Sequence, residues 1–210
     1  MTDDDDDDPV LAAAMQHIQA GAFDAAADTL RQAVAEGPER DEASRRRHLT
    51  RVMNLGDLLV YLRAFDEAEA VLRAGLQGRA DLYGRTHPGY AYGLEPLAEA
   101  LLRAGRARQA LPVAEQAVAI LWNHNHERTP ELMTLRAFVR VAVDPEDEAF
   151  QDMEALPARL IQVAIDTALE RAGRDLTHGP LVLRQLLAWM DAHGHGGDRR
   201  SAVRAALADA

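Results

Sequence analysis

The sequence predicts an all-α protein in which antiparallel helix pairs are stacked into an array, and three observations support this prediction. First, three similar segments recur at an interval of 42 residues: FDAAADTLRQAV at 23–34, FDEAEAVLRAGL at 65–76 and ARQALPVAEQAV at 107–118. Second, the chain is 48% hydrophobic but only 5% aromatic, with alanine as the main apolar residue. Third, small residues return at the same positions of each copy, which suits close contacts between helices.

The small residues form columns when the three copies are aligned at this interval. These columns are Ala14, Gly56 and Ala98; Ala26, Ala68 and Ala110; and Ala33, Gly75 and Ala117. A small residue at a fixed helical position lets a neighbouring helix approach closely, while a Leu or an aromatic residue beside it fills the remaining gap. We therefore expect Ala26, Ala68 and Ala110 to be buried at the crossings of paired helices.

The same alignment sets the expected limits of the helices. First and second helices are predicted at 10–20 and 24–36, at 44–62 and 66–79, and at 89–104 and 107–123. A further first helix runs from Pro130, a favourable residue for the first helical position, to Val143. Arg63 stands where the other copies have Gly21 and Gly105, which predicts a less tight turn. Pro96 lacks an N–H donor and should kink or shorten its helix.

The two ends of the chain depart from the repeat. Residues 1–8 include the run Asp3–Asp8, which cannot bury apolar area, so we expect a disordered acidic tail before the repeats at 9–143. Beyond residue 145 the register is lost, although ALPARLIQVAIDTALERAG, PLVLRQLLAWM and SAVRAALADA still indicate helices. We expect 144–210 to be degenerate helices that cap the array, because terminal repeats need a polar outer face.

Charge and composition exclude several classes of protein. The net charge is −11, and a phosphate backbone requires a basic face, so nucleic acid is not an expected partner. The chain contains no Cys and no Lys, which excludes disulfides, thiolate metal sites and a Schiff-base lysine. The sequence has no signal peptide and no apolar run of the roughly 18 residues that a membrane span needs, so we expect a cytoplasmic protein without a membrane segment.

Polar clusters do not suggest catalysis. His124 and His126, like His193 and His195, are separated by one residue in predicted loops, which is not the spacing of a helical zinc site. Asp57, Glu95 and Glu99 have no nucleophile or phosphate-binding loop beside them. We therefore predict no enzyme activity, no metal and no cofactor.

The columns resemble the tetratricopeptide repeat (TPR) over roughly residues 9–140. The period of 42 residues exceeds the usual ~34 and is similar to the long repeats of kinesin light chains and many bacterial proteins. The linker YGRTHPGYA at 83–91 strengthens the resemblance, since a Gly-x-x-His-Pro linker is typical there. The resemblance implies a right-handed superhelical solenoid in which the first helices line a concave groove for a peptide.

The resemblance also implies which residues line this groove. By register they are Thr50, Met53, Asn54, Asp57, Tyr61, Tyr92, Glu95, Glu99 and Arg103, and Thr134, Phe138 and Arg140 continue the series. Asn54 matches an Asn whose side-chain amide can bond a peptide backbone. Arg45, Arg46, Arg47 and Arg51 are a solvated face, a secondary contact for an acidic peptide or phosphate, or a docking place for the acidic tail.

We therefore predict an adaptor or scaffold that binds another protein or peptide. The alternative is a regulatory or sensor subunit that controls an effector enzyme, such as a protease, supplied by another chain. The paired Lys and Asn that clamp a C-terminal carboxylate in some relatives are not available, because the chain has no Lys.

Overall fold

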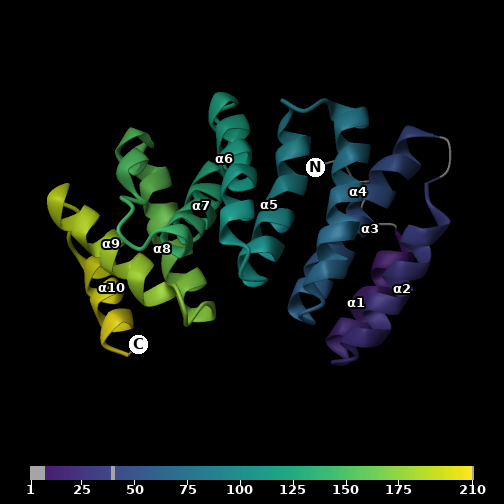
Figure 1. Ribbon diagram of the computed structural model, residues 1–210, viewed down its shortest axis with the longest axis horizontal. Helices are drawn as coiled ribbons and strands as arrows, with labels where there is room; N and C mark the ends of the chain where they lie inside the picture. Colours follow the sequence, from purple (N-terminus) through teal and green to yellow (C-terminus); the bar gives the residue numbers. More distant parts are fainter. Residues whose placement is uncertain (1–7, 39–40, 210) are drawn as a thin grey trace. The chain divides into compact units, whose positions relative to one another are not determined.

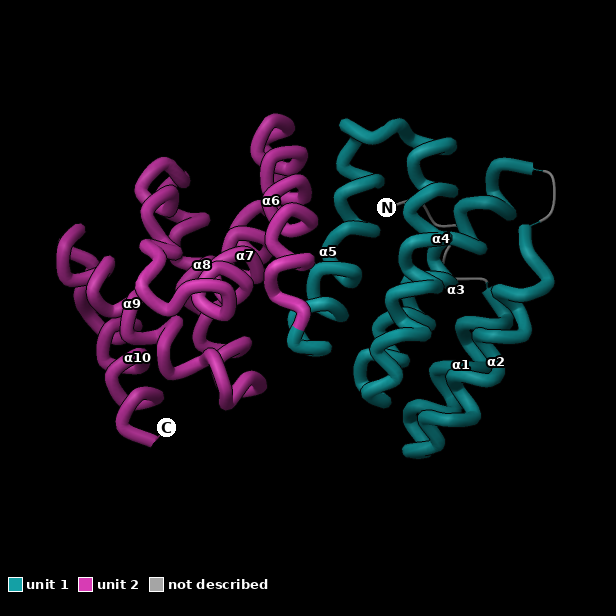
Figure 2. The backbone as a smooth tube through the Cα atoms, viewed as in Figure 1, with its two compact units in different colours: residues 1–105 teal, residues 106–210 magenta. Residues whose placement is uncertain are grey.

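The computed structural model describes residues 8–38 and 41–209, which form two compact units (Figure 2). The expected tail through Asp7 therefore lies outside the described residues. The first unit, residues 1–105, contains the helices α1 (Pro9–Gln19), α2 (Phe23–Glu36), α3 (Glu42–Tyr61), α4 (Phe65–Tyr83) and α5 (Pro88–Arg103) (Figure 1). The second unit, residues 106–210, contains α6 (Ala107–Asn123), α7 (Thr129–Val143), the 3-10 helix η2 (Gln151–Ala155), α8 (Ala158–Arg174), α9 (Gly179–Ala192) and α10 (Asp198–Ala208).

The predicted all-α fold is confirmed, and most predicted helix limits agree with the structure within two residues. The largest difference is at the C-terminal end of α4, which is predicted at residue 79 but lies at Tyr83. The helix ends there because Gly84 adopts a φ of 81°. The sequence did not predict η2, which directly precedes α8. Among the described residues, no helix has both the length and the apolar character that crossing a bilayer requires.

Within unit 1, each helix packs against the next one along the chain, and α3 also contacts α5. This is the packing that stacked antiparallel pairs require, because the first helix of one pair must also meet the first helix of the next. Ala26 and Ala68 have exposed fractions of 0%, and Ala14 and Gly56 are buried as well. The predicted small-residue columns are thus buried contacts.

Unit 2 has the same sequential packing, from α6 against α7 to α9 against α10. Ala110, Ala114 and Ala117 are buried on α6, so the columns continue there. The core that follows combines small residues such as Ala164 and Ala168 with larger side chains, including Met153 on η2. Phe138 on α7 is also fully buried, so the expectation that it continues the groove lining is wrong.

The turn at Arg63 is as tight as the glycine turns, so the expectation of a looser turn is wrong. Arg63 has φ 62°, close to the 73° of Gly21 and the 74° of Gly105. The next N–H closes the turn in the same way: Ala64 donates to the Leu59 carbonyl at 2.8 Å, as Ala22 does to that of His17. This capping bond holds Arg63 in the left-handed region, at a cost of roughly 1–2 kcal/mol for a non-glycine residue.

Pro96 does not shorten its helix either. α5 runs without interruption from Pro88 to Arg103, and Pro96 is buried within it. Since most of α5 is buried, tertiary packing holds the helix across the missing N–H donor.

Asp8 is part of the folded unit, unlike the solvated tail that the sequence predicts. Its side chain is 0% exposed and accepts a hydrogen bond from the Val10 N–H at 2.9 Å, which caps α1. Arg51 on α3 donates to both oxygens of the same carboxylate, at 2.8 and 2.9 Å. A sequence-based alternative, docking of the acidic run on the arginine cluster, thus holds for this one residue.

Candidate functional site

The solvent-accessible residues of α5 form a single line. From Gly89 to Arg103, every residue is buried except Tyr92, Glu95, Glu99 and Arg103. Their spacing of three and then four residues keeps all four side chains on one side of the helix. These are the four residues of α5 that the repeat register assigns to a binding groove.

The second half of α3 is likewise accessible to solvent along one side only. Between Val52 and Tyr61, the residues that are not buried are Met53, Asn54, Asp57 and Tyr61, and Thr50 lies one turn earlier on the same side. Because α3 and α5 pack against each other in unit 1, their accessible lines belong to neighbouring helices. We refer to these nine residues of α3 and α5 together as the α3–α5 face.

Hydrogen bonds along α3 fix part of this face. Thr50 Oγ1 donates to the Arg46 carbonyl at 3.2 Å, and Asn54 Nδ2 donates to the Thr50 carbonyl at 2.9 Å. This bond uses one of the two N–H donors of the Asn54 side-chain amide, and it fixes the orientation of the amide and hence of its carbonyl oxygen. Tyr61 is 59% exposed, and its ring packs against Phe23 of α2 with the centroids 4.6 Å apart.

Arg79 on α4 supports the face from inside unit 1, and the sequence analysis missed it. It is only 7% exposed, donates from Nη1 to the Gly89 carbonyl at 2.7 Å, and contacts Met53 Sδ with Nη2. Burial lowers the pKa of this guanidinium. Arg79 thus joins α3, α4 and the first turn of α5. Nothing in the sequence distinguishes it from the many solvated arginines.

A glycine leaves room for this buried arginine. A Cβ added to Gly93 would lie 2.7 Å from Arg79 Cδ and 2.9 Å from Leu76 Cδ2, both on α4. Only glycine therefore allows the α5 backbone to approach the guanidinium stem so closely. Gly93 and Arg79 together set how far α5 lies from α4, and hence where its accessible line is.

The predicted arginine cluster at the start of α3 does not act as one patch. Arg51 pairs with the buried Asp8 carboxylate and is itself 19% exposed. Arg46 pairs with Glu42 at 2.5 Å, and its guanidinium carbon lies 5.8 Å from the centroid of the Tyr83 ring. The helical period explains this division, because successive residues of α3 point in different directions.

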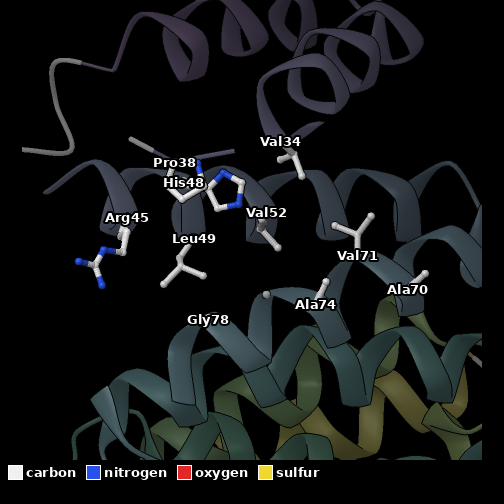
Figure 3. A pocket seen from close by; sticks show the side chains of 11 residues that line it. Val34, Pro38, Arg45, His48, Leu49, Val52, Ala70, Val71, Ala74 and Gly78 are labelled. Atoms are coloured by element: carbon white, nitrogen blue, oxygen red, sulfur yellow. The ribbon is translucent and has the colours of Figure 1, made fainter. Parts of the chain in front are cut away.

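Arg45 and His48 instead border an apolar cavity of about 520 Å³ in unit 1 (Figure 3). Val34 of α2 lies across the cavity from Val71 of α4, while Leu49 and Val52 of α3 contribute to its lining. Burial lowers the pKa of His48, and the charge of Arg51 lowers it further. Arg45 is therefore the fixed positive charge at this cavity.

The two histidine pairs serve local structure. Nδ1 of His124 lies 2.8 Å from the Ile120 carbonyl, and Nδ1 of His126 accepts from the Arg128 N–H at 3.1 Å. His193 contacts the Trp189 carbonyl through Nδ1 at 2.8 Å. Across 8–38 and 41–209, no group of three His, Asp or Glu side chains is arranged to hold a metal ion.

Comparison with known proteins agrees with this architecture. Residues 48–121 match the tetratricopeptide repeat family. A solved structure of nearly identical TPR-like repeats of the kinesin light chain type, from Podosopora anserina, superimposes with a TM-score of 0.60. It shares 18% sequence identity, and the superposition covers 100% of this chain and 98% of that one. No curated protein sequence matches the chain significantly.

Residues 48–121 are therefore similar to tetratricopeptide repeats. The sequence match identifies the repeats within 48–121, and the structural likeness extends the fold to the remaining helices. TPR domains are in general protein–protein interaction modules, and such scaffolds are typically non-catalytic. Neither likeness names a partner.

Proposed function

We propose that this protein is an adaptor or scaffold that binds a segment of a partner protein on the α3–α5 face of unit 1. One observation carries the proposal: the accessible residues of α5 and of the second half of α3 are those that the repeat register assigns to the groove. A helix needs only its buried side for stability, so two aligned accessible lines with Tyr, Asn, Arg and carboxylate side chains are a suitable surface for a peptide.

Each kind of side chain contributes a different interaction. Tyr92 and Tyr61 offer large rings with a polar tip, which makes tyrosine a frequent anchor at interfaces. Asn54 presents an amide that can accept from and donate to an extended backbone. Arg103 is exposed at the C-terminal end of α5, where it can pair with a side-chain or terminal carboxylate of the bound segment.

Substitutions on this face test the proposal. We expect Asn54→Ala, Tyr92→Ala and Arg103→Glu each to weaken binding by about 1–3 kcal/mol, the usual range for interface anchors. The measurement is a calorimetric titration with the protein that co-purifies with the full chain, with thermal melts of the same variants. The melts should not change, because the three side chains lie outside the core.

Arg85→Glu is the matched control, because Arg85 is exposed in unit 1 on the loop between α4 and α5. This variant makes the same charge change as Arg103→Glu outside the face and should bind normally. Unchanged binding in all three face variants would contradict the proposal, as would an equal loss in Arg85→Glu.

A further inference from the structure

The helix α1 differs in charge from every other helix that the structure describes. Each of the others carries at least two Asp, Glu or Arg side chains, whereas α1 carries none. A helix without charges is usually buried, but Ala14 is the only residue of α1 that is buried. Met15, a large apolar side chain, is 51% exposed. α1 therefore presents an uncharged and partly apolar surface to solvent.

Two contacts place α1 alongside α3 within unit 1. Asp8, which caps the start of α1, pairs with Arg51 on α3 at 2.8 Å. At the other end, Phe23, which follows the turn between α1 and α2, packs its ring against that of Tyr61, with the centroids 4.6 Å apart. α1 therefore runs in the same direction as α3, beginning near Arg51 and ending near Tyr61. It is a neighbour of the α3–α5 face.

The repeat register places the accessible side of α1 in line with this face. The α3 residues that follow Thr50 in the face have equivalents one interval earlier in α1, and these are Leu11, Ala12, Met15 and Gln19. None of the four is buried, and their spacing keeps them on one side of the helix. We refer to them as the α1 stripe.

Side-chain chemistry changes in one direction along the equivalent positions of the three helices. α1 supplies apolar side chains, α3 a mixture, and α5 carboxylates. These positions are Leu11, Met53 and Glu95, followed one helical turn later by Met15, Asp57 and Glu99. A charged residue bound over α1 would lose water without meeting an opposite charge on this helix, which is costly, whereas an apolar residue there would gain free energy.

α1 is fixed in place at both ends, so the stripe is formed before anything binds. At the start, Oδ1 of Asp8 accepts from the Val10 N–H at 2.9 Å. At the end, the Ala22 N–H donates to the His17 carbonyl at 2.8 Å and closes the turn. Little backbone order has to be gained when a segment docks, which lowers the entropic cost of binding.

The residues of the stripe suit a large apolar side chain. Ala12 has a single methyl group where α3 has Asn54, so a partner side chain can lie close to the helix backbone. Leu11 and Met15 are one turn apart on the same side of this position. The flexible thioether of Met15 can adapt to apolar groups of different shape.

We propose that the segment bound on the α3–α5 face continues over α1 with an uncharged stretch. Within this stretch a large apolar side chain, that of Leu, Met or Phe, packs against Leu11 and Met15. The change in chemistry along the three helices also sets the direction of binding, because only the apolar end of the segment matches α1. This inference rests on the function proposed above and specifies which segments the face selects.

Random peptides of about 12 residues, displayed on phage and selected on the full chain, provide the probe. An extended peptide of this length spans roughly 40 Å, which is enough to cross three helices about 10 Å apart. We expect the enriched peptides to have an uncharged stretch with Leu, Met or Phe toward one end. Enriched peptides with charges at both ends would contradict the proposal, as would a selection that enriches no peptide.

The most enriched peptide is then labelled with fluorescein and titrated by fluorescence anisotropy. Met15→Glu should weaken its binding about ten-fold or more, because an apolar contact is replaced by a charge. Gln16→Glu is the matched control: Gln16 is also exposed on α1 but points about 100° away around the helix. It introduces the same charge and should bind normally, and circular dichroism would verify both folds. An equal loss in the control would show repulsion by net charge rather than contact with the stripe.

A second peptide, with Ser in place of its apolar residue, tests whether that residue meets Met15. The replacement should weaken binding to the parent protein about ten-fold but cause little further loss in Met15→Glu, because both changes remove the same contact. Equal losses in the two proteins would show that the apolar residue binds elsewhere.

Tyr92→Ala separates failure of this inference from failure of the proposed function. If Tyr92→Ala weakens peptide binding and Met15→Glu does not, the peptide binds the α3–α5 face without reaching α1, and only the inference is wrong. If neither variant weakens binding, the α3–α5 face is not the binding surface and both are wrong. A loss in Met15→Glu alone would likewise contradict both, because the peptide would then bind α1 without the face.

Discussion

The two units bury different kinds of side chain at their helix contacts. In unit 1, helices meet at Ala14, Ala26, Gly56 and Ala68, and the larger buried side chains there are mostly leucines. In unit 2, the columns persist on α6, but Phe138, Met153, Trp189 and Met190 fill the core beyond it. Unit 1 thus places small residues at one fixed position of each helix pair, whereas unit 2 beyond α6 combines small buried residues, such as Ala164 and Ala168 on α8, with large side chains.

This difference explains where the repeat can be recognised. Close approach requires a small residue at one fixed position of every pair, so it leaves a periodic pattern in the sequence. A core of large side chains can be filled in many combinations if the total volume is kept, so it imposes no period. The loss of register after residue 145 therefore accompanies a core in which large Phe, Met and Trp side chains join the small ones, while the helical architecture continues.

The largest expected effect comes from enlarging a small residue in unit 1. Ala68→Arg should destabilise the protein by more than about 3 kcal/mol, because it overpacks a helix crossing and buries an unpaired charge. Ala35→Arg, at an exposed position of α2, makes the same chemical change and should be nearly neutral. Thermal and urea denaturation of both variants measure the difference. A melting temperature for Ala68→Arg equal to that of the parent protein would disprove the packing described for unit 1.

A second comparison uses one ion pair from each unit. Asp8–Arg51 in unit 1 and Asp166–Arg199 in unit 2 both have two short bonds, but the Asp8 side chain is buried while that of Asp166 is 54% exposed. Asp8→Asn should cost about 2–3 kcal/mol, because the cap acceptor is kept but Arg51 loses its charge partner. Asp166→Asn should cost at most about 0.5 kcal/mol. Equal losses in urea denaturation would show that burial does not distinguish the pairs.

The contribution of the Asp8 carboxylate to the free energy of unfolding should depend on pH. Burial raises the pKa of this carboxyl, but the Arg51 side chain and the Val10 N–H together outweigh burial and hold the pKa below its usual value. The stabilisation is then fully present above the unfolded-state pKa of about 3.9 and is lost as the pH falls through the lower folded-state pKa. The difference in unfolding free energy between the parent protein and Asp8→Asn should therefore shrink below about pH 4. A constant difference down to pH 2.5 would contradict this assignment.

Glycine substitutions should produce the smallest changes in stability. Gly93→Ala in unit 1 should cost about 1–2 kcal/mol, since its Cβ would meet Arg79, which is held by the Gly89 carbonyl. Gly173→Ala in α8 of unit 2 meets no atom within 4 Å and should stabilise by up to about 1 kcal/mol through helix propensity. Circular-dichroism melts should show changes of opposite sign. A stabilising Gly93→Ala would mean that Arg79 is not fixed in place.

The sequence predicted the features that follow from periodicity. The helices and the buried columns at Ala26 and Ala68 follow from one interval and one helical period, while the choice of Tyr92 and Arg103 as accessible positions follows from the resemblance to tetratricopeptide repeats. The turn at Arg63 does not follow from residue type, because the capping hydrogen bond of the repeat holds even a non-glycine residue in the left-handed region.

Contacts between residues far apart in the sequence could not be predicted in this way. Asp8 is one of six consecutive aspartates, and only the position of α3 brings Arg51 to it. Arg79 is one of 23 basic residues, and its burial depends on the space beside Gly93. The position of the loop before η2 depends on Gln185 bonding Ala149, 36 residues earlier, which leaves no periodic pattern.

The proposal that partners bind the α3–α5 face can be tested most directly by site-specific crosslinking, since the chain has no Cys and accepts a unique one. Glu99→Cys on the accessible line of α5 and Gln32→Cys on the exposed surface of α2 would each carry a benzophenone maleimide. Both labelled proteins would be irradiated with the protein that co-purifies with the parent chain. We predict a crosslinked product from Glu99→Cys and little from Gln32→Cys. Crosslinking from Gln32→Cys alone would contradict binding on the α3–α5 face.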